Sequence, residues 1–208
     1  MRHAPAFLLC ALVCFLQGCS RTSDATDKEP VKATYDSSGK LTELAYDSNH
    51  NGKVDTWTEM NGNRAVRTRI DRNEDGKIDR WEYYDDHSNL VKVGLSRGDT
   101  GTPDAWVFAG TDGKPRRIDI SSSGDEHKID RWEHYVGDTL TAVEEDTNRD
   151  DVVDKWETYE AGVLKTASFD ENGDGKPDRR MSYADGRLIA IDTDPDLSGA
   201  FRKHVVVN

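Results

Sequence analysis

A unit of about 25 residues recurs six times along the chain, and this repetition constrains the fold more than any other feature. Its best-preserved copy opens with DRNEDGKIDRWE at Asp71. Consecutive copies start 24, 25, 26, 24 and 24 residues apart, at Asp47, Asp71, Ser96, Ser122, Asp146 and Asp170. All five tryptophans fall at the eleventh place of a copy, where the sixth copy has Arg180 instead. We therefore expect one supersecondary unit to be stacked on the next.

Each unit has two short arms joined by turn residues, which predicts β-hairpins. Segments such as YEAGVL (159–164) and YADGRL (183–188) place Gly or Asp where a tight turn needs a positive φ. Arms of about five to seven residues suit strands and are too short for stable helices. The prediction is an all-β antiparallel meander of about thirteen strands, as an elongated single sheet or shallow superhelix rather than a closed barrel. The array resembles MORN-type hairpin repeats.

The composition favours a thin fold. The chain is 33% charged and 35% hydrophobic, with a mean hydropathy of −0.82, too polar for a thick core. Five Trp and seven Tyr argue against a disordered chain. The net charge of −12 makes nucleic acid an unexpected partner and cations expected ones. Bound cations would reconcile a weak apolar core with a stable fold.

The opening of each unit resembles a calcium-binding loop. The segment from Asp71 satisfies D-x-[DN]-x-[DN]-G-x5-E, with the backbone carbonyl of Lys77 as a further ligand. Glycine at the sixth place would let the first, third and fifth side chains converge on one ion. The predicted side-chain ligands are Asp47, Asn49, Asn51 and Asp55; Asp71, Asn73, Asp75 and Asp79; Asp146, Asn148, Asp150 and Asp154; and Asp170, Asn172, Asp174 and Asp178.

The residue that closes the ion's coordination depends on the element that follows the loop. In an EF-hand the exiting helix presents the twelfth residue, here Glu82. A strand would carry Glu82 about 10 Å beyond Asp79, so Asp79 is the better ligand. This nine-residue form resembles the hairpin calcium loops of integrin α-chains, a likeness confined to the loop.

The loops are not equally preserved. The fifth has Asp151 where glycine is expected, and those from Ser96 and Ser122 lack the first, third and fifth ligands, so we expect no metal in either. Both still keep the ninth-place aspartate, Asp104 or Asp130, which predicts a second role in capping the loop backbone. A degenerate seventh copy starts at Asp192.

The N-terminal segment indicates export. Residues 1–18 have a basic start and an apolar run, and LQGC resembles the lipobox of bacterial lipoproteins, which implies lipidation of Cys19. Residues 19–33 are then the lipidated cysteine and a flexible tether, and 34–208 the repeat domain. By resemblance, Ser20 favours the outer membrane.

The motifs favour a non-enzymatic protein of the cell envelope. The six His are scattered, and nucleophile and phosphate-loop motifs are absent. The expected function is that of a calcium-binding lipoprotein with a structural or protein-interaction role, held to the membrane through Cys19. An unknown envelope protein or a polysaccharide is the expected partner. The alternative is a carbohydrate-binding module that stacks sugars on the tryptophan column.

Overall fold

The fold is known from a computed structural model that describes residues 31–207, and all regular secondary structure in this range is β-strand. Over the same residues there is no helix long and apolar enough to cross a membrane. The strands are β1 (Lys32–Tyr35), β2 (Leu41–Tyr46), β3 (Thr56–Asn61), β4 (Arg64–Ile70), β5 (Arg80–Tyr84), β6 (Leu90–Leu95), β7 (Ala105–Ala109), β8 (Pro115–Ile120), β9 (Arg131–Val136), β10 (Thr139–Glu145), β11 (Lys155–Glu160), β12 (Val163–Phe169), β13 (Arg179–Ala184), β14 (Arg187–Pro195) and β15 (Phe201–Val206).

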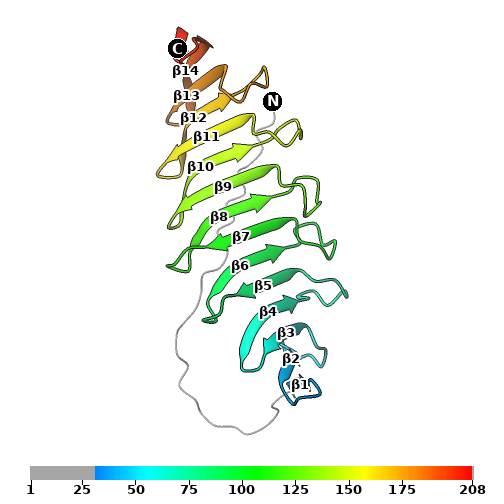
Figure 1. The fold of residues 1–208 in the computed structure, drawn as a ribbon. Coiled ribbons are helices and arrows are strands. Elements are labelled where there is room, and N and C mark those ends of the chain that lie inside the picture. The colour runs from blue at the N-terminus through cyan, green and yellow to red at the C-terminus, as the bar shows by residue number, and fades with distance from the viewer. Residues whose placement is uncertain (1–30, 208) are drawn as a thin grey trace.

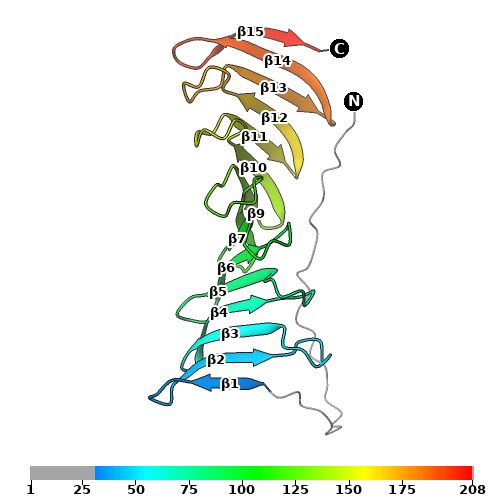
Figure 2. The same ribbon diagram turned by 90° about the vertical axis from the view of Figure 1, so that its right-hand side faces the viewer.

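These fifteen strands form one open antiparallel sheet in which each strand pairs with its neighbours in sequence, from β1 to β15 (Figure 1). The elongated meander is confirmed, and the sheet is not closed into a barrel. The expected thirteen strands were too few, because β1 and β15 add one at each end. β1 starts at Lys32, inside the segment expected to be a tether. The sheet twists along its length, so its two ends face different directions (Figure 2).

The strands are connected differently along the two long sides of the sheet, where their ends lie; each such side is called an edge below. Tight turns join odd to even strands along one edge, and the six aspartate-rich loops join even to odd strands along the other (Figure 1). Each of the seven hairpins closed by a tight turn, from β1–β2 to β13–β14, carries a register shift near that turn, for example between Tyr83 and Tyr84. Such bulges bend a strand and increase its twist. The ladders that lead into the six loops are regular.

The sheet has a single layer and a correspondingly small core. The buried hydrophobic side chains of residues 31–207 are Trp81, Val93, Ala105, Val143, Ala167 and Ala190. Alternation places successive side chains on opposite faces. Trp81 lies opposite Arg69 and Gly94 in the register, whereas the hydroxyl of Tyr84 bonds to Glu82 on the other face.

Candidate functional site

The six loops form a continuous column along one edge of the sheet. The backbone N–H of each first-place residue donates to the carbonyl of the ninth-place aspartate in the preceding loop: Asp71 to Asp55 at 2.9 Å, Ser96 to Asp79 at 2.9 Å, Ser121 to Asp104 at 2.9 Å, Asp146 to Asp130 at 2.9 Å and Asp170 to Asp154 at 2.8 Å. This pattern corrects the fourth copy, which starts at Ser121 instead of Ser122. Its loop holds one extra residue, so the true spacing around it is 25 and 25.

The ninth-place aspartate caps every loop. Its carboxylate accepts the N–H of the second-place residue in all six copies: Ser48 to Asp55, Arg72 to Asp79, Arg97 to Asp104, Ser122 to Asp130, Thr147 to Asp154 and Glu171 to Asp178, at 2.6–3.0 Å. The two loops without metal ligands share this bond with the four loops that keep all four predicted side-chain ligands, which we call the complete loops. The expected capping role is therefore confirmed.

The first-place aspartates of the four complete loops are buried and turned inward. Asp47, Asp71, Asp146 and Asp170 are 4–8% exposed. Each carboxylate accepts the N–H of the sixth-place residue, at 2.5 Å from Gly52, 2.9 Å from Gly76, 2.8 Å from Asp151 and 2.6 Å from Gly175. Burial works to raise the pKa of Asp47, but bonds from several backbone amides outweigh it and lower the pKa. The same balance lowers the pKa of Asp170.

The third- and fifth-place side chains follow the same rule. In the second loop, Oδ1 of Asn73 accepts the N–H of Asp75 at 3.1 Å, and Oδ1 of Asp75 accepts that of Lys77 at 2.9 Å. The corresponding bonds recur in the other complete loops: Asn49 with Asn51, Asn51 with Lys53, Asn148 with Asp150, Asp150 with Val152, Asn172 with Asp174 and Asp174 with Lys176. One oxygen of each side chain thus fixes the loop. The second oxygen of Asp150 accepts the side-chain amide of Asn148 at 3.1 Å, and that of Asp75 lies 3.5 Å from Lys77 Nζ.

The sixth place needs a left-handed backbone. Its φ is 91° at Gly52, 91° at Gly76 and 82° at Gly175. Asp151, which replaces glycine in the fifth loop, takes the same conformation with a φ of 68°. Asp tolerates this region better than most residues, so the fifth loop keeps the shape of the others at some cost in strain.

The four complete loops differ at the ninth place. A second-place hydroxyl takes the other carboxylate oxygen in two of them, from Ser48 to Asp55 at 2.7 Å and from Thr147 to Asp154 at 2.8 Å. In the second loop the backbone amides of Arg72 and Asn73 both donate to the same oxygen, Oδ2 of Asp79, at 2.6 Å and 3.3 Å. The sixth loop has the same arrangement around Asp178, whose Oδ1 accepts the side-chain amide of Asn172 at 2.8 Å.

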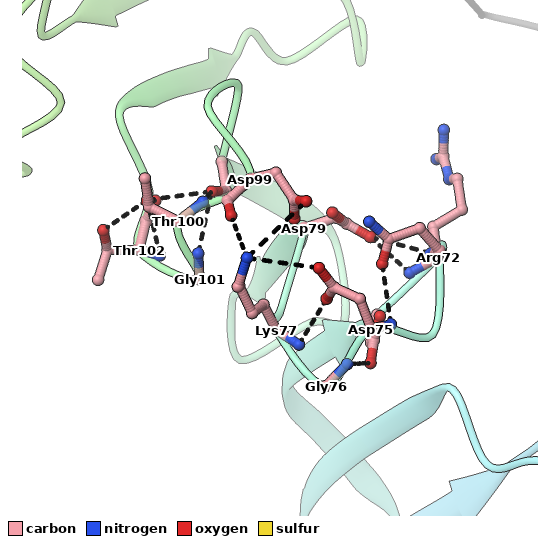
Figure 3. Close-up of polar contacts among 12 residues, drawn as sticks. Arg72, Asp75, Gly76, Lys77, Asp79, Asp99, Thr100, Gly101 and Thr102 are labelled. Atoms are coloured by element: carbon pink, nitrogen blue, oxygen red, sulfur yellow. Dashed lines mark hydrogen bonds and ion pairs between the residues drawn. The ribbon is translucent and has the colours of Figure 1, made fainter.

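The second loop also contains an unsatisfied buried oxygen. Asp71 is 5% exposed, and its Oδ1 has no hydrogen-bond partner among the described residues. Leaving a buried carboxylate oxygen unpaired is costly, and a cation is one way to satisfy it. Lys77 Nζ lies 3.5 Å from Oδ2 of Asp75 (Figure 3). Within residues 31–207, no three His, Cys, Asp or Glu side chains are already gathered closely enough to hold a metal ion. An ion would therefore have to draw the ligands together and displace the Lys77 ammonium.

The degenerate loops use arginine in place of metal ligands. In the third loop, Nε of Arg97 donates to Oδ1 of Asp104 at 3.1 Å. In the fourth, Nε of Arg149 lies 3.4 Å from Oδ2 of Asp130. The segment from Asp192 is not a seventh loop, because it forms the end of β14 and a tight turn closed by Asp196.

The tryptophan column shows packing contacts. Trp81 is 8% exposed. The ring of Trp106 covers Gly94, where an added Cβ would lie 2.6 Å from the ring, and the ammonium of Lys92 lies 3.6 Å from the ring centroid. These contacts give at least two of the five tryptophans a place in the sheet's own packing.

Together, the fold and the loops define an open, single-layer β-hairpin repeat protein with an aspartate-rich loop edge. No family model and no curated protein matches the chain. One solved structure that part of the chain matches is the crystal structure of accessory secretory protein 1, 2 and 3 in Streptococcus pneumoniae, at 12% identity and a TM-score of 0.39. The match covers 53% of this chain and 19% of that one.

Proposed function

We propose that the protein binds calcium through the loops 47–55, 71–79, 146–154 and 170–178, and that the ions support a structural or protein-interaction role at the bacterial cell envelope. The observation that carries the proposal is the buried Oδ1 of Asp71, which has no partner in the described residues and lies in a loop of oxygen ligands. Carboxylate, amide and backbone carbonyl oxygens are the donors that Ca²⁺ prefers. The second loop offers Asp71, Asn73, Asp75 and Asp79, with the carbonyl of Lys77 as a further donor.

Calcium would supply positive charge to an edge crowded with carboxylates. Binding to the folded state alone would stabilise the sheet by ligand linkage. The gain matters here because few apolar side chains are buried in the single layer. Affinities of 10⁻⁴–10⁻³ M, in the range of extracellular calcium modules, would load the loops outside the cell.

Isothermal titration calorimetry of the protein with CaCl₂ tests this function. We expect saturable binding at two or more sites, and the loss of one site each in Asp71→Asn and Asp170→Asn. Asp86→Asn is the matched control, because Asp86 lies at the tight-turn edge with its side chain 84% exposed. Heats that do not saturate in the unmodified protein would refute calcium binding.

We also propose membrane attachment through Cys19, which lies outside the described residues. The lipobox LQGC supports this attachment. Cys19→Ser should move the protein from the membrane to the soluble fraction. A membrane-bound Cys19→Ser protein would contradict the anchor.

A further inference from the structure

The loops touch one another through side chains at their fourth place. Glu74, at the fourth place of the second loop, reaches back into the first. Its Oε1 accepts bonds from the side-chain amides of Asn49, at 2.7 Å, and Asn51. Lys53 Nζ lies 3.4 Å from Oε2, and the Glu74 side chain is only 13% exposed. The carboxylate of one repeat thus stands among the predicted ligands of another.

Asp99 occupies the same place one repeat later. Lys77 Nζ donates to its backbone carbonyl at 2.9 Å and lies 4.0 Å from its carboxylate (Figure 3). The same Lys77 Nζ lies 3.5 Å from Oδ2 of Asp75, a predicted ligand of the second loop. Oδ1 of Asp99, like Oδ1 of Asp71, is buried without a partner in the described residues. Two unsatisfied oxygens therefore come from consecutive loops.

Where a charged fourth-place side chain contacts a neighbouring loop, the sign of its charge depends on whether that loop keeps its predicted metal ligands. Arg149 reaches the fourth loop, which has lost its metal ligands, donating to the Ser122 hydroxyl at 2.9 Å with Nε 3.4 Å from Asp130. An acid therefore enters the first and second loops, which keep their ligands, and a base enters the fourth loop, which has lost them. Gly173, at the fourth place of the sixth loop, has no side chain to offer.

We propose that each calcium ion in the first two loops is shared across a repeat boundary, with Glu74 as a ligand of the loop 47–55 and Asp99 as a ligand of the loop 71–79. This inference rests on the proposed calcium binding. The first loop needs the extra carboxylate, because two of its four side-chain ligands are neutral amides and both oxygens of Asp55 are engaged by Ser48. In the second loop, an ion held by both repeats would satisfy Oδ1 of Asp71, a residue that is 95% buried, together with Oδ1 of Asp99.

Calcium titration of the ¹⁵N-glycine-labelled full chain by NMR tests the shared ligands. Gly52, Gly76 and Gly175 report on three separate loops, because each amide bonds to the first-place aspartate of its own loop. Glu74→Gln should weaken binding about tenfold at Gly52, and Asp99→Asn should do so at Gly76, since ligand charge sets calcium affinity in such loops. Gly175 should titrate as in the unmodified protein in both variants. Asp86→Asn, with the same change in charge, should leave all three midpoints unchanged.

The outcomes distinguish a failure of the shared ligands from a failure of the proposed calcium binding on which they rest. Calcium-dependent shifts in the unmodified protein, with midpoints in Glu74→Gln and Asp99→Asn equal to those of Asp86→Asn, would overturn the shared ligands alone. Equal weakening at all three glycines would also overturn them, because it would reflect net charge. Glycine signals whose chemical shifts do not change with calcium in the unmodified protein would overturn both proposals.

Discussion

The hydroxyl of Tyr84 donates a 2.6 Å hydrogen bond to Oε2 of Glu82. Nε of Arg80 donates to the other oxygen, Oε1, at 2.7 Å. Glu82 is the twelfth residue of the EF-hand pattern, yet both of its oxygens are engaged within β5. The same trio recurs in β9 as Arg131, Glu133 and Tyr135. In this sheet the glutamate therefore bonds to side chains of its own strand and not to the loop.

This arrangement predicts opposite results for two substitutions. Asp79→Asn removes a charge from the loop and should weaken calcium binding at that site about tenfold, because ligand charge sets affinity. Glu82→Gln should leave calcium affinity unchanged. Calorimetric titration of the two variants distinguishes them. Weaker binding in Glu82→Gln would contradict this prediction and indicate that Glu82 is a ligand, as in an EF-hand.

Loss of stability in acid is a second expectation. Hydrogen bonds lower the pKa of Asp36, chiefly from Ser38, and of Asp192, chiefly from His204 and Arg180, below the ordinary 3.8. A carboxyl whose pKa is lower in the folded state stabilises the fold above its ordinary pKa, and this contribution is lost as the pH falls through the folded value. Urea unfolding in EDTA should therefore give a constant free energy between pH 5 and 7 and a falling one below about pH 4. A free energy unchanged down to pH 2 would contradict these shifts.

The left-handed sixth place predicts a stabilising substitution. Asp151→Gly should raise the free energy of unfolding by about 0.5–1 kcal/mol, because glycine adopts the φ of 68° without strain. Gly76→Ala is the counterpart and should destabilise by a similar amount, since an added Cβ at φ 91° has no atom within 4 Å and the effect is conformational. Urea denaturation in EDTA measures both. A destabilised Asp151→Gly protein would show that the Asp151 side chain contributes more than its strain costs.

Gly94 tests the packing role of the tryptophan column. Gly94→Ala places a Cβ 2.6 Å from the ring of Trp106, so the ring must move. Such overpacking should cost about 1–3 kcal/mol and shift the tryptophan fluorescence to the red. Gly98→Ala, whose φ is also not left-handed and whose added Cβ would meet no atom closer than 3.6 Å, controls for the substitution itself. Unchanged fluorescence in Gly94→Ala would contradict a packed Trp106.

The sequence predicted the sheet well because its signals are local. Turn glycines and the spacing of the tryptophans fix the hairpin period, and the short arms on either side of each turn indicate strands. The bulges were not predicted, since a register shift such as that between Leu140 and Ala142 depends on the twist of the assembled sheet.

The loops were predicted less completely. Ser121, Ser122 and Ser123 are identical, so the alignment could not locate the extra residue, which the bond from Ser121 to Asp104 reveals. The contact of Glu74 with Asn49 and Asn51 joins residues 25 and 23 positions apart, and the motif places Glu74 at a variable position. Only the stacking of the loops shows what the fourth-place side chain meets.

Thermal unfolding with and without calcium tests the central claim most directly. The melting temperature in 10 mM CaCl₂ should exceed that in EDTA by about 5 °C or more, because two or more ions bound at about ten times their Kd each add about 1.4 kcal/mol. Sodium chloride of equal ionic strength should not reproduce the rise. Equal melting temperatures in calcium and in EDTA would contradict a sheet stabilised by calcium.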